Sequence, residues 1–293
     1  MLPILPSSLR DALGVGDLSP ELLMRRYGDD ARLVEVRGQP VRIKESGQGE
    51  PLVLLHGFSS SADTWDGWRR ALADRFRVIA VDVPPFAITG PLRDRPSNPE
   101  AVLGFLHELF DALGLDSFFL AGNSLGGFLS WQYAYRHPER VRKLILIDSV
   151  GYYHHPPASI RMFLTPGLDR LAAGLSPRAL VAANIRSVFG DPSRMEGAAV
   201  QRYHDLLRRE GTRRAVADIM RPVYVDHPEI RQLRLPVLVM WGAADRWVPP
   251  AHGYRFQREI PGASLIMYDG LGHIPMEEDP VRTAADARQF LLA

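Results

Sequence analysis

The sequence contains no cysteine, almost no lysine and no long apolar run. The absence of cysteine excludes thiol catalysis, disulfide bonds and thiolate-bound metals. Lys44 and Lys143 are the only lysines, and 35 basic against 34 acidic residues give a formal net charge of +1. This balance gives no reason to expect a nucleic-acid partner. No apolar run approaches the length that spans a bilayer, and charged residues interrupt any signal-peptide core in the first 30 positions. We therefore expect a soluble, cytoplasmic protein.

The composition is that of an ordinary globular protein, with 46% hydrophobic and 24% charged residues over 293 positions. Short apolar runs rich in β-branched residues alternate with segments of helical periodicity. Near-continuous apolar runs suit strands that are covered on both faces, as in parallel sheets. The pattern predicts a doubly wound, mostly parallel α/β sheet, preceded by a hairpin over 32–51 with Gly38 near its turn. The expected core strands are 51–57, 77–83, 118–124, 143–150, 236–245 and 264–270.

One long interval, residues 151–232, contains amphipathic segments but no strand-like run. Ligands bind outside the carboxyl ends of the strands in open α/β sheets, so an insertion there suits a helical cap over a binding site. The predicted organisation is a core made of 1–150 and 233–293, in which 1–30 is an N-terminal extension, and a cap made of 151–232.

The stretch "FFLAGNSLGGFLSW" (118–131) places Ser124 between Gly122 and Gly126, where a strand pattern gives way to a helix pattern. A Gly-x-Ser-x-Gly sequence in this context indicates a nucleophile elbow, a sharp turn that exposes the serine hydroxyl. A glycine-rich turn with an incidental serine would give the same five letters. The choice between the two depends on whether a base and an acid accompany the serine.

Nine histidines compete for the role of base, and His273 is favoured because it follows the last strand in "YDGLGHIPMEEDP". Two acids compete for the role of its partner. Asp245 follows the next-to-last strand in "WGAADRWVPP", whereas Asp148 ends the strand before the cap in "LIDSV". We favour Asp245 and keep Asp148 as the substitute, with a buried aspartate at the entry to the cap as its simpler interpretation.

With these motifs in order along the chain, the sequence resembles the α/β-hydrolase superfamily, and within it a capped serine carboxylesterase. The resemblance rests on "LLHGFSSSADTW", "GNSLGG", "LIDSVGYY", "WGAADRWVPP" and "GLGHIPMEEDP". It implies hydrolysis of esters through an acyl-enzyme, with Ser124 as nucleophile, His273 as base and Asp245 as its partner. It further implies an oxyanion hole formed by the backbone N–H groups of Phe58 and Leu125. We expect no metal or organic cofactor, because serine, histidine and backbone amides would supply every step.

The loop after the second core strand departs from the family pattern. Members of this superfamily usually have Asp-x-Pro-Gly-x-Gly there, whereas this chain reads "DVPPFAITG", with Pro85 and Ala87 in place of two glycines. Without glycine, a loop conformation that needs positive φ is strained. Because the loop normally borders the entrance, we expect its shape and the substrate preference to differ.

Two alternatives to an esterase remain open. Carbon–carbon bond hydrolases of ring-cleavage dienoates share the Gly-Asn-Ser elbow, but they tend to have a glycine-rich loop after His-Gly and a tryptophan after the catalytic histidine. This chain has "FSSS" and Ile274 at those positions. A ligand receptor with a slow triad is the second alternative. Ser124 disfavours the dehalogenases and epoxide hydrolases of this superfamily, which attack with aspartate.

The substrate is expected to be a small ester held in an apolar pocket. The interval 151–232 carries 12 arginines and 8 acidic residues, which would suit an anionic substrate but is explained more simply by charged faces of exposed helices. Eight residues are expected to line the pocket, although each also suits a plain core position: Trp65, Phe86, Phe128, Tyr152, Tyr153, Met162, Phe163 and Trp247.

Overall fold

Residues 6–293, which the computed structural model describes, form an eight-stranded sheet in the order β1-β2-β4-β3-β5-β6-β7-β8. Only β2 runs against its neighbours β1 and β4, and the remaining pairs are parallel. The predicted doubly wound, mostly parallel sheet is confirmed. The strands are β1 (Arg32–Val36), β2 (Gln39–Ser46), β3 (Glu50–Leu55), β4 (Phe76–Val81), β5 (Phe118–Asn123), β6 (Val141–Ile147), β7 (Val237–Gly242) and β8 (Ser264–Tyr268).

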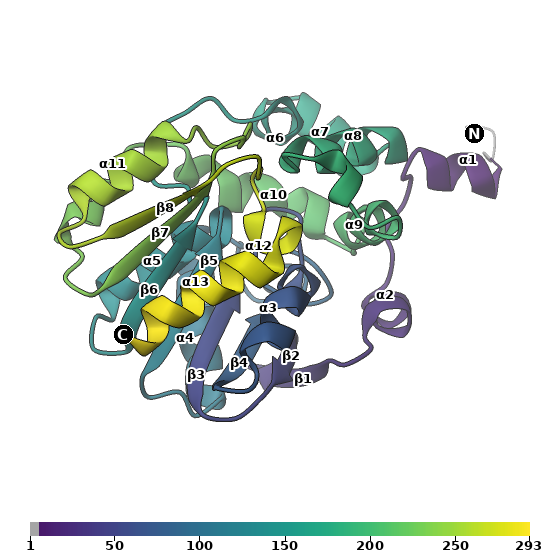
Figure 1. The fold of residues 1–293 in the computed structure, drawn as a ribbon. Coiled ribbons are helices and arrows are strands. Elements are labelled where there is room, and N and C mark those ends of the chain that lie inside the picture. The colour runs from purple at the N-terminus through teal and green to yellow at the C-terminus, as the bar shows by residue number, and fades with distance from the viewer. Residues whose placement is uncertain (1–5) are drawn as a thin grey trace.

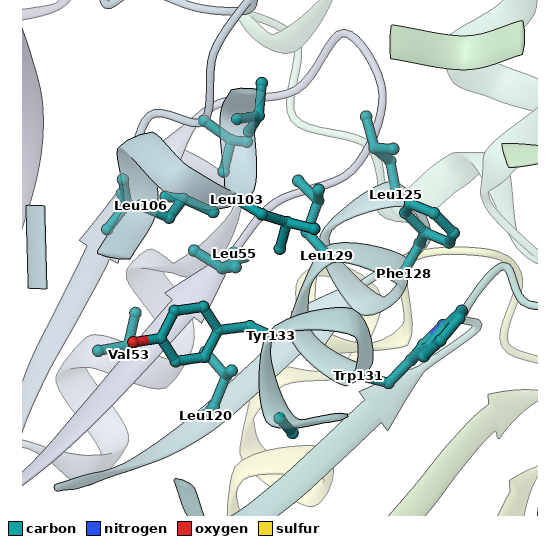
Figure 2. Packing of buried hydrophobic residues seen from close by; sticks show 14 of the residues in the cluster. Val53, Leu55, Leu103, Leu106, Leu120, Leu125, Phe128, Leu129, Trp131 and Tyr133 are labelled. Carbon is teal, nitrogen blue, oxygen red and sulfur yellow. The ribbon is translucent and has the colours of Figure 1, made fainter. Parts of the chain in front are cut away.

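Both faces of the central strands of the sheet are buried, which explains why these strands read as continuous apolar runs. Successive side chains of a strand point to opposite faces. In β3, Val53 and Leu55 belong to one hydrophobic cluster, whereas Leu52 and Leu54 belong to another. Figure 2 shows the first cluster, where Leu103 and Leu106 meet the sheet. Helices α4 (Pro99–Ala112), α5 (Leu125–Arg136) and α11 (Ala251–Glu259) contribute to the first cluster, and α3 (Asp66–Leu72), α12 (Pro275–Glu278) and α13 (Pro280–Leu292) to the second.

The first two strands form the expected hairpin. Its turn consists of Arg37 and Gly38, which have φ of 49° and 73°. Two consecutive residues with positive φ are characteristic of the tight turn whose twist matches that of antiparallel strands. The hairpin places the Arg42 side chain in the interior, where it contacts Asp82 at 3.1 Å and Asp63 at 2.9 Å.

Asp82 fixes two loops that follow the carboxyl ends of β3 and β4. Its Oδ1 accepts a hydrogen bond from the N–H of Ala62 at 2.8 Å, and its Oδ2 accepts one from the N–H of Ile88 at 3.0 Å. Ala87, one of the residues that replace glycine in this loop, has a φ of 55°. The loop therefore keeps a left-handed backbone at Ala87, although an L-residue with a Cβ adopts it at a cost. The neighbouring hydrogen bond to Asp82 helps to hold it.

The interval 151–232 is helical and contains no strand. Figure 1 shows its helices gathered beyond one end of the sheet. The helices are α6 (Ala158–Leu164), α7 (Leu168–Gly174), α8 (Arg178–Val188), α9 (Ala199–Leu207) and α10 (Thr212–Met220), with short 3-10 turns at Pro192–Arg194, Arg221–Val223 and Pro228–Gln232. The division of the chain into a core and a cap at these boundaries stays a prediction.

The predicted N-terminal extension contains α1 (Ser7–Ala12) and α2 (Pro20–Tyr27), and its first five residues lie outside the described residues. It is bound to the helical interval by arginines. Arg213 donates to the carbonyl of Gly14 at 2.8 Å, and Arg208 donates to Asp11 at 2.6 Å. Part of the arginine excess in 151–232 therefore serves to hold this segment. No helix within residues 6–293 combines the length and the apolar character needed to cross a membrane.

Candidate active site

Ser124 lies between β5 and α5, at a turn that leaves no space for side chains on its flanking glycines. A Cβ on Gly122 would lie 2.2 Å from the carbonyl oxygen of Gly126, and a Cβ on Gly126 would lie 2.1 Å from that of Leu55. Real Cβ atoms do not approach backbone oxygens so closely. The glycines on either side of Ser124 are thus required by the contact of α5 with β5 and β3.

The backbone of Ser124 itself is strained, with a φ of 56°. A non-glycine residue holds such a conformation only where its surroundings impose it. Here the N–H of Ser124 donates to the carbonyl of Ile147 at 2.9 Å, and its carbonyl accepts from the N–H of Phe128 at 3.0 Å. Leu125 is the first residue of α5, so its N–H has no acceptor within the helix. The turn thus brings a hydroxyl and an unused amide donor together.

His273 and Asp245 form a buried pair. Nδ1 of His273 donates to Oδ2 of Asp245 at 2.8 Å, which leaves Nε2 as the ring nitrogen that can accept a proton. The other carboxylate oxygen accepts from the backbone N–H groups of Trp247 at 2.7 Å and Val248 at 3.1 Å. The Trp247 ring stacks on the His273 ring with a centroid distance of 5.7 Å. These contacts fix the imidazole in one orientation and one tautomer.

Asn123 connects the serine turn to the histidine loop. Its side-chain amide donates to the carbonyl of His273 at 2.9 Å and to that of Ile147 at 3.2 Å. The sequence interpretation did not assign Asn123 a role. The available signal was the position of Asn123 beside Ser124, because a side-chain amide next to a strained turn can donate hydrogen bonds to nearby backbone carbonyls.

Ser124 and His273 line the same cavity, whose volume is about 80 Å³. The wall combines loops of the sheet with α6, α8 and α9 and is mostly apolar, and it contains no arginine or lysine. The lining residues are Gly57, Phe58, Ser59, Ser60, Asn123, Ser124, Ser159, Phe163, Val181, Asn184, Ile185, Val188, Tyr203, Leu207, Trp247, His273 and Ile274.

Phe163 and Trp247 are the two expected pocket residues that line this cavity, and the other six do not. Tyr153 is 55% exposed, and Met162 packs against the first cluster. The remaining four are core residues because their rings fill the space between sheet and helices: Trp65, Phe86, Phe128 and Tyr152. Sequence reasoning missed Asn184, Ile185 and Tyr203, which carry no motif and reach the cavity only through the packing of the helices, and it assigned no pocket role to Ser60 in the loop after β3.

The loop after β3 lies against the serine. A Cβ on Gly57 would be 3.0 Å from Cβ of Ser124, and the Phe58 ring packs edge to face on Phe86. His56 holds this loop: Nδ1 donates to the Gly57 carbonyl at 2.8 Å, and Nε2 accepts from a backbone N–H at 2.9 Å. Burial lowers the pKa of His56, which keeps the ring neutral, as this bonding pattern requires.

Asp148 lies beside the His273–Asp245 pair but does not form a hydrogen bond with His273. Oδ1 of Asp148 accepts from the N–H of Gly242 at 2.9 Å. The polar atoms that Asp148, Asp245 and His273 offer all lie within 4.8 Å of one another. Burial and the charge of Asp245 raise the pKa of Asp148 well above its ordinary value. In this structure Asp245, and not Asp148, therefore hydrogen-bonds the imidazole of His273. Outside this pair, none of the remaining histidines lines the cavity.

Comparisons with known proteins place this geometry in context. Residues 52–287 match the model of the alpha/beta hydrolase family. The chain is similar to the 2-hydroxy-6-oxo-2,4-heptadienoate hydrolase of Pseudomonas putida, with 30% identity over 254 residues that cover 83% of this chain and 89% of that protein. It is also similar to Lipase 1 of Psychrobacter immobilis, with 28% identity over 83% of this chain and 77% of that protein. Among solved structures, a membrane phospholipase A described as a bacterial virulence factor has 26% identity and a TM-score of 0.77, with 93% and 91% of the two chains covered.

Proposed function

The chain belongs to the alpha/beta hydrolase family, and from this premise we propose that it is a serine hydrolase that cleaves small, uncharged carboxylic esters. The observation that carries the proposal is the hydrogen bond of 2.8 Å between His273 and Asp245, together with the position of His273 in the same cavity as Ser124. A serine hydroxyl becomes a useful nucleophile only when an oriented base takes its proton. All three side chains are nearly buried, so water competes little for their hydrogen bonds.

In the proposed mechanism, Oγ of Ser124 attacks the ester carbonyl while Nε2 of His273 takes the hydroxyl proton. The N–H groups of Leu125 and Phe58 stabilise the negative charge that develops on the carbonyl oxygen. The C–O bond of the ester then breaks, and His273 gives its proton to the departing alcohol. A water molecule, activated by the same histidine, hydrolyses the acyl-enzyme, and Asp245 stabilises the imidazolium in both steps.

The walls of the cavity support an uncharged substrate. Val181, Ile185 and Phe163 supply apolar surface, and no arginine or lysine lines the cavity. Burying a carboxylate without a charged partner is costly. A dienoate carries such a group, whereas a simple ester does not. At ~10–15 Å³ per water-sized space, a cavity of about 80 Å³ suits a short acyl group, and the similarity to Lipase 1 of Psychrobacter immobilis is consistent with ester chemistry.

The helical interval is part of the proposal, as a cap that closes the acyl pocket. Ser159 and Phe163 from α6, Asn184 and Ile185 from α8 and Tyr203 from α9 contribute to the cavity wall. We accordingly assign 151–232 as the cap and 1–150 together with 233–293 as the hydrolase core. In this assignment the core supplies the reacting groups, and the cap determines the shape of the pocket that holds the substrate.

Hydrolysis of a carbon–carbon bond in a ring-cleavage dienoate is the second candidate. The observation in its favour is the 30% identity to the Pseudomonas putida hydrolase over most of both chains. A panel of acetate, butyrate and palmitate esters, an amide, a lactone and a ring-cleavage dienoate would separate the two candidates. The ester proposal predicts the highest kcat/KM for a short ester. A higher kcat/KM for the dienoate would contradict it in favour of the second candidate.

The serine mechanism is tested by labelling with a fluorophosphonate, followed by peptide mass spectrometry. The reagent should modify the peptide that contains Ser124 and abolish ester hydrolysis, and Ser124→Ala should neither react nor turn over. Ser60→Ala is the matched control, since Ser60 lines the same cavity but has no proposed reaction. It should still be labelled. Labelling at another residue, with activity retained by Ser124→Ala, would contradict the mechanism.

A further inference from the structure

Asp148 is a fully buried acid at the carboxyl end of β6. Its backbone N–H donates to the carbonyl of Met240 at 3.0 Å, and its φ of 44° lies in the left-handed region. Oδ1 accepts the N–H of Gly242, whereas Oδ2 has no hydrogen-bond partner among the described residues. Because an unpaired buried oxygen is unfavourable, this position calls for an explanation.

The surroundings of Asp148 decide where its proton resides. The strongest charge near it is that of Asp245, and Glu278 adds a second negative charge, while the Gly242 N–H is the chief stabilising group. Asp245 itself receives two backbone N–H groups and the N–H of His273. Tyr268 from β8 is a further titratable group close to Asp148. Two buried carboxyl groups this close do not both ionise. Asp245 accepts three N–H groups, whereas Asp148 accepts only one, so the proton is better placed on Asp148.

We propose that Asp148 is a protonated carboxylic acid whose Oδ2 hydroxyl donates a hydrogen bond to Asp245, and that it acts as a positioning residue for the Asp245–His273 pair. The inference rests on the proposed function, because it concerns how that pair serves as base. The geometry behind it is the placement of the polar atoms of all three residues within 4.8 Å of one another. The raised pKa of Asp148, caused mainly by burial, agrees with it.

The hydrogen bond has a chemical consequence for catalysis. A donor on Asp245 spreads the negative charge of its carboxylate and so weakens the attraction between Asp245 and a protonated imidazole. The neutral imidazole, which is the form that accepts the serine proton, then persists to lower pH. Removal of the donor concentrates the charge on Asp245, so the acid-side midpoint of kcat/KM should move to higher pH.

The test compares Asp148→Asn with Asp148→Ala. The asparagine amide can donate to Asp245 while its carbonyl accepts from Gly242, so this variant should keep the wild-type pH midpoint and lose less than about threefold in kcat. Asp148→Ala removes the donor and should lose about tenfold or more, as expected for a charge-assisted hydrogen bond, with its midpoint shifted to higher pH. Equal losses in the two variants, or an unshifted midpoint in Asp148→Ala, would overturn the proposal.

A second measurement needs no turnover. Infrared spectroscopy of the protein at neutral pH should show the carbonyl stretch of a protonated carboxylic acid, and this band should be absent from Asp148→Asn. Ser124→Ala, in which the proposed catalysis is lost, should keep the band. The assignment of Asp148 can thus succeed while the esterase proposal fails, or fail while it succeeds. If wild type and Asp148→Asn gave the same spectrum in this region, Asp148 would be ionised and the inference wrong.

Discussion

The side-chain amide of Asn123 donates a hydrogen bond of 2.9 Å to the backbone carbonyl of His273, across 150 positions of sequence. The same amide contacts the carbonyl of Ile147 at 3.2 Å. Asn123 therefore ties three strand ends together, since it ends β5 next to Ser124, Ile147 ends β6, and His273 follows β8. The distance between Ser124 and His273, the proposed nucleophile and base, depends on this one side chain as well as on the sheet.

Asn123→Ala should lower kcat by about ten- to a hundredfold and change KM less, because misplacement of reacting groups by a fraction of an ångström is costly. Steady-state kinetics on a short ester measures both constants. Asn98→Ala is a suitable control, since the Asn98 side chain caps α4 at 2.9 Å from the N–H of Ala101 and lies outside the cavity. It should lower the free energy of unfolding by about 1 kcal/mol without lowering kcat. Equal kcat values for Asn123→Ala and wild type would contradict the role of Asn123.

Asp245→Asn should lower kcat by about four orders of magnitude, as loss of the orienting carboxylate does in serine triads. An asparagine can present its amide N–H to Nδ1 of His273, which favours the wrong tautomer. Asp148→Asn provides the comparison, since Asp148 does not bond His273, and it should cost far less. If the two variants ranked in the opposite order, the role of the orienting acid would pass to Asp148.

The sheet was predictable because its signals are local. The run 118–122 contains no polar side chain and β5 is buried throughout, and Gly38 lies in the hairpin turn. The candidate reacting groups could be chosen for the same reason. Ser124, Asp245 and His273 each follow a strand, and the carboxyl ends of parallel strands meet at one edge of a sheet.

The cavity was not predictable because its walls depend on packing between distant helices. Trp65 and Phe86 are large and aromatic, but their rings are buried in the core and do not reach the cavity. Hydrophobicity alone does not distinguish a core ring from a pocket ring. Val181 and Ile185 reach the cavity only because of where α8 lies. The positive φ of Ala87 could not be predicted either. It is accompanied by a hydrogen bond from the N–H of Ile88 to Asp82, which connects the two ends of the turn and leaves no signal in the sequence.

Enlarging the cavity should shift acyl preference. Phe163→Ala, and more mildly Ile185→Val, should raise kcat/KM for butyrate and longer esters relative to acetate, because each removes apolar volume from the wall. Tyr153→Ala serves as the control because Tyr153 is 55% exposed and does not line the cavity. Thermal unfolding identifies any loss of folded protein, which is expected when a core side chain is shortened. An unchanged chain-length profile in both cavity variants would refute the assignment of this wall.

Exhaustive chelation should leave ester hydrolysis unchanged. Asp148, Asp245 and His273 lie close enough to surround an ion, but a ligating nitrogen must be free of its proton. Nδ1 of His273 instead donates to Asp245, whose other oxygen already accepts two backbone N–H groups. Activity and metal content should be measured before and after dialysis against a chelator. Loss of activity that a divalent cation restores would show that an ion belongs to the site.

Stability should fall as the pH drops from neutrality, because several histidines are buried in the neutral form. Burial, followed by the neighbouring charges of His154 and Arg255, lowers the pKa of His252 to about 4, against roughly 6.5 in an unfolded chain. Above the higher value neither state binds the proton. Between the two values the unfolded chain binds a proton that the folded protein refuses, so the free energy of unfolding decreases with falling pH. His56 and His204 shift in the same direction, chiefly through burial.

Urea unfolding of wild type and His252→Gln at about pH 7.5 and about pH 5 measures this contribution. His252→Gln removes one of the groups that titrate, so it should lose less stability between the two pH values than wild type does. His155→Gln changes an exposed histidine and should follow wild type, which controls for the loss of an imidazole as such. Because glutamine differs from histidine in packing, only the difference between the two pH values is compared, not the absolute stability. If His252→Gln and wild type lost the same stability over this interval, His252 would carry its proton equally in both states.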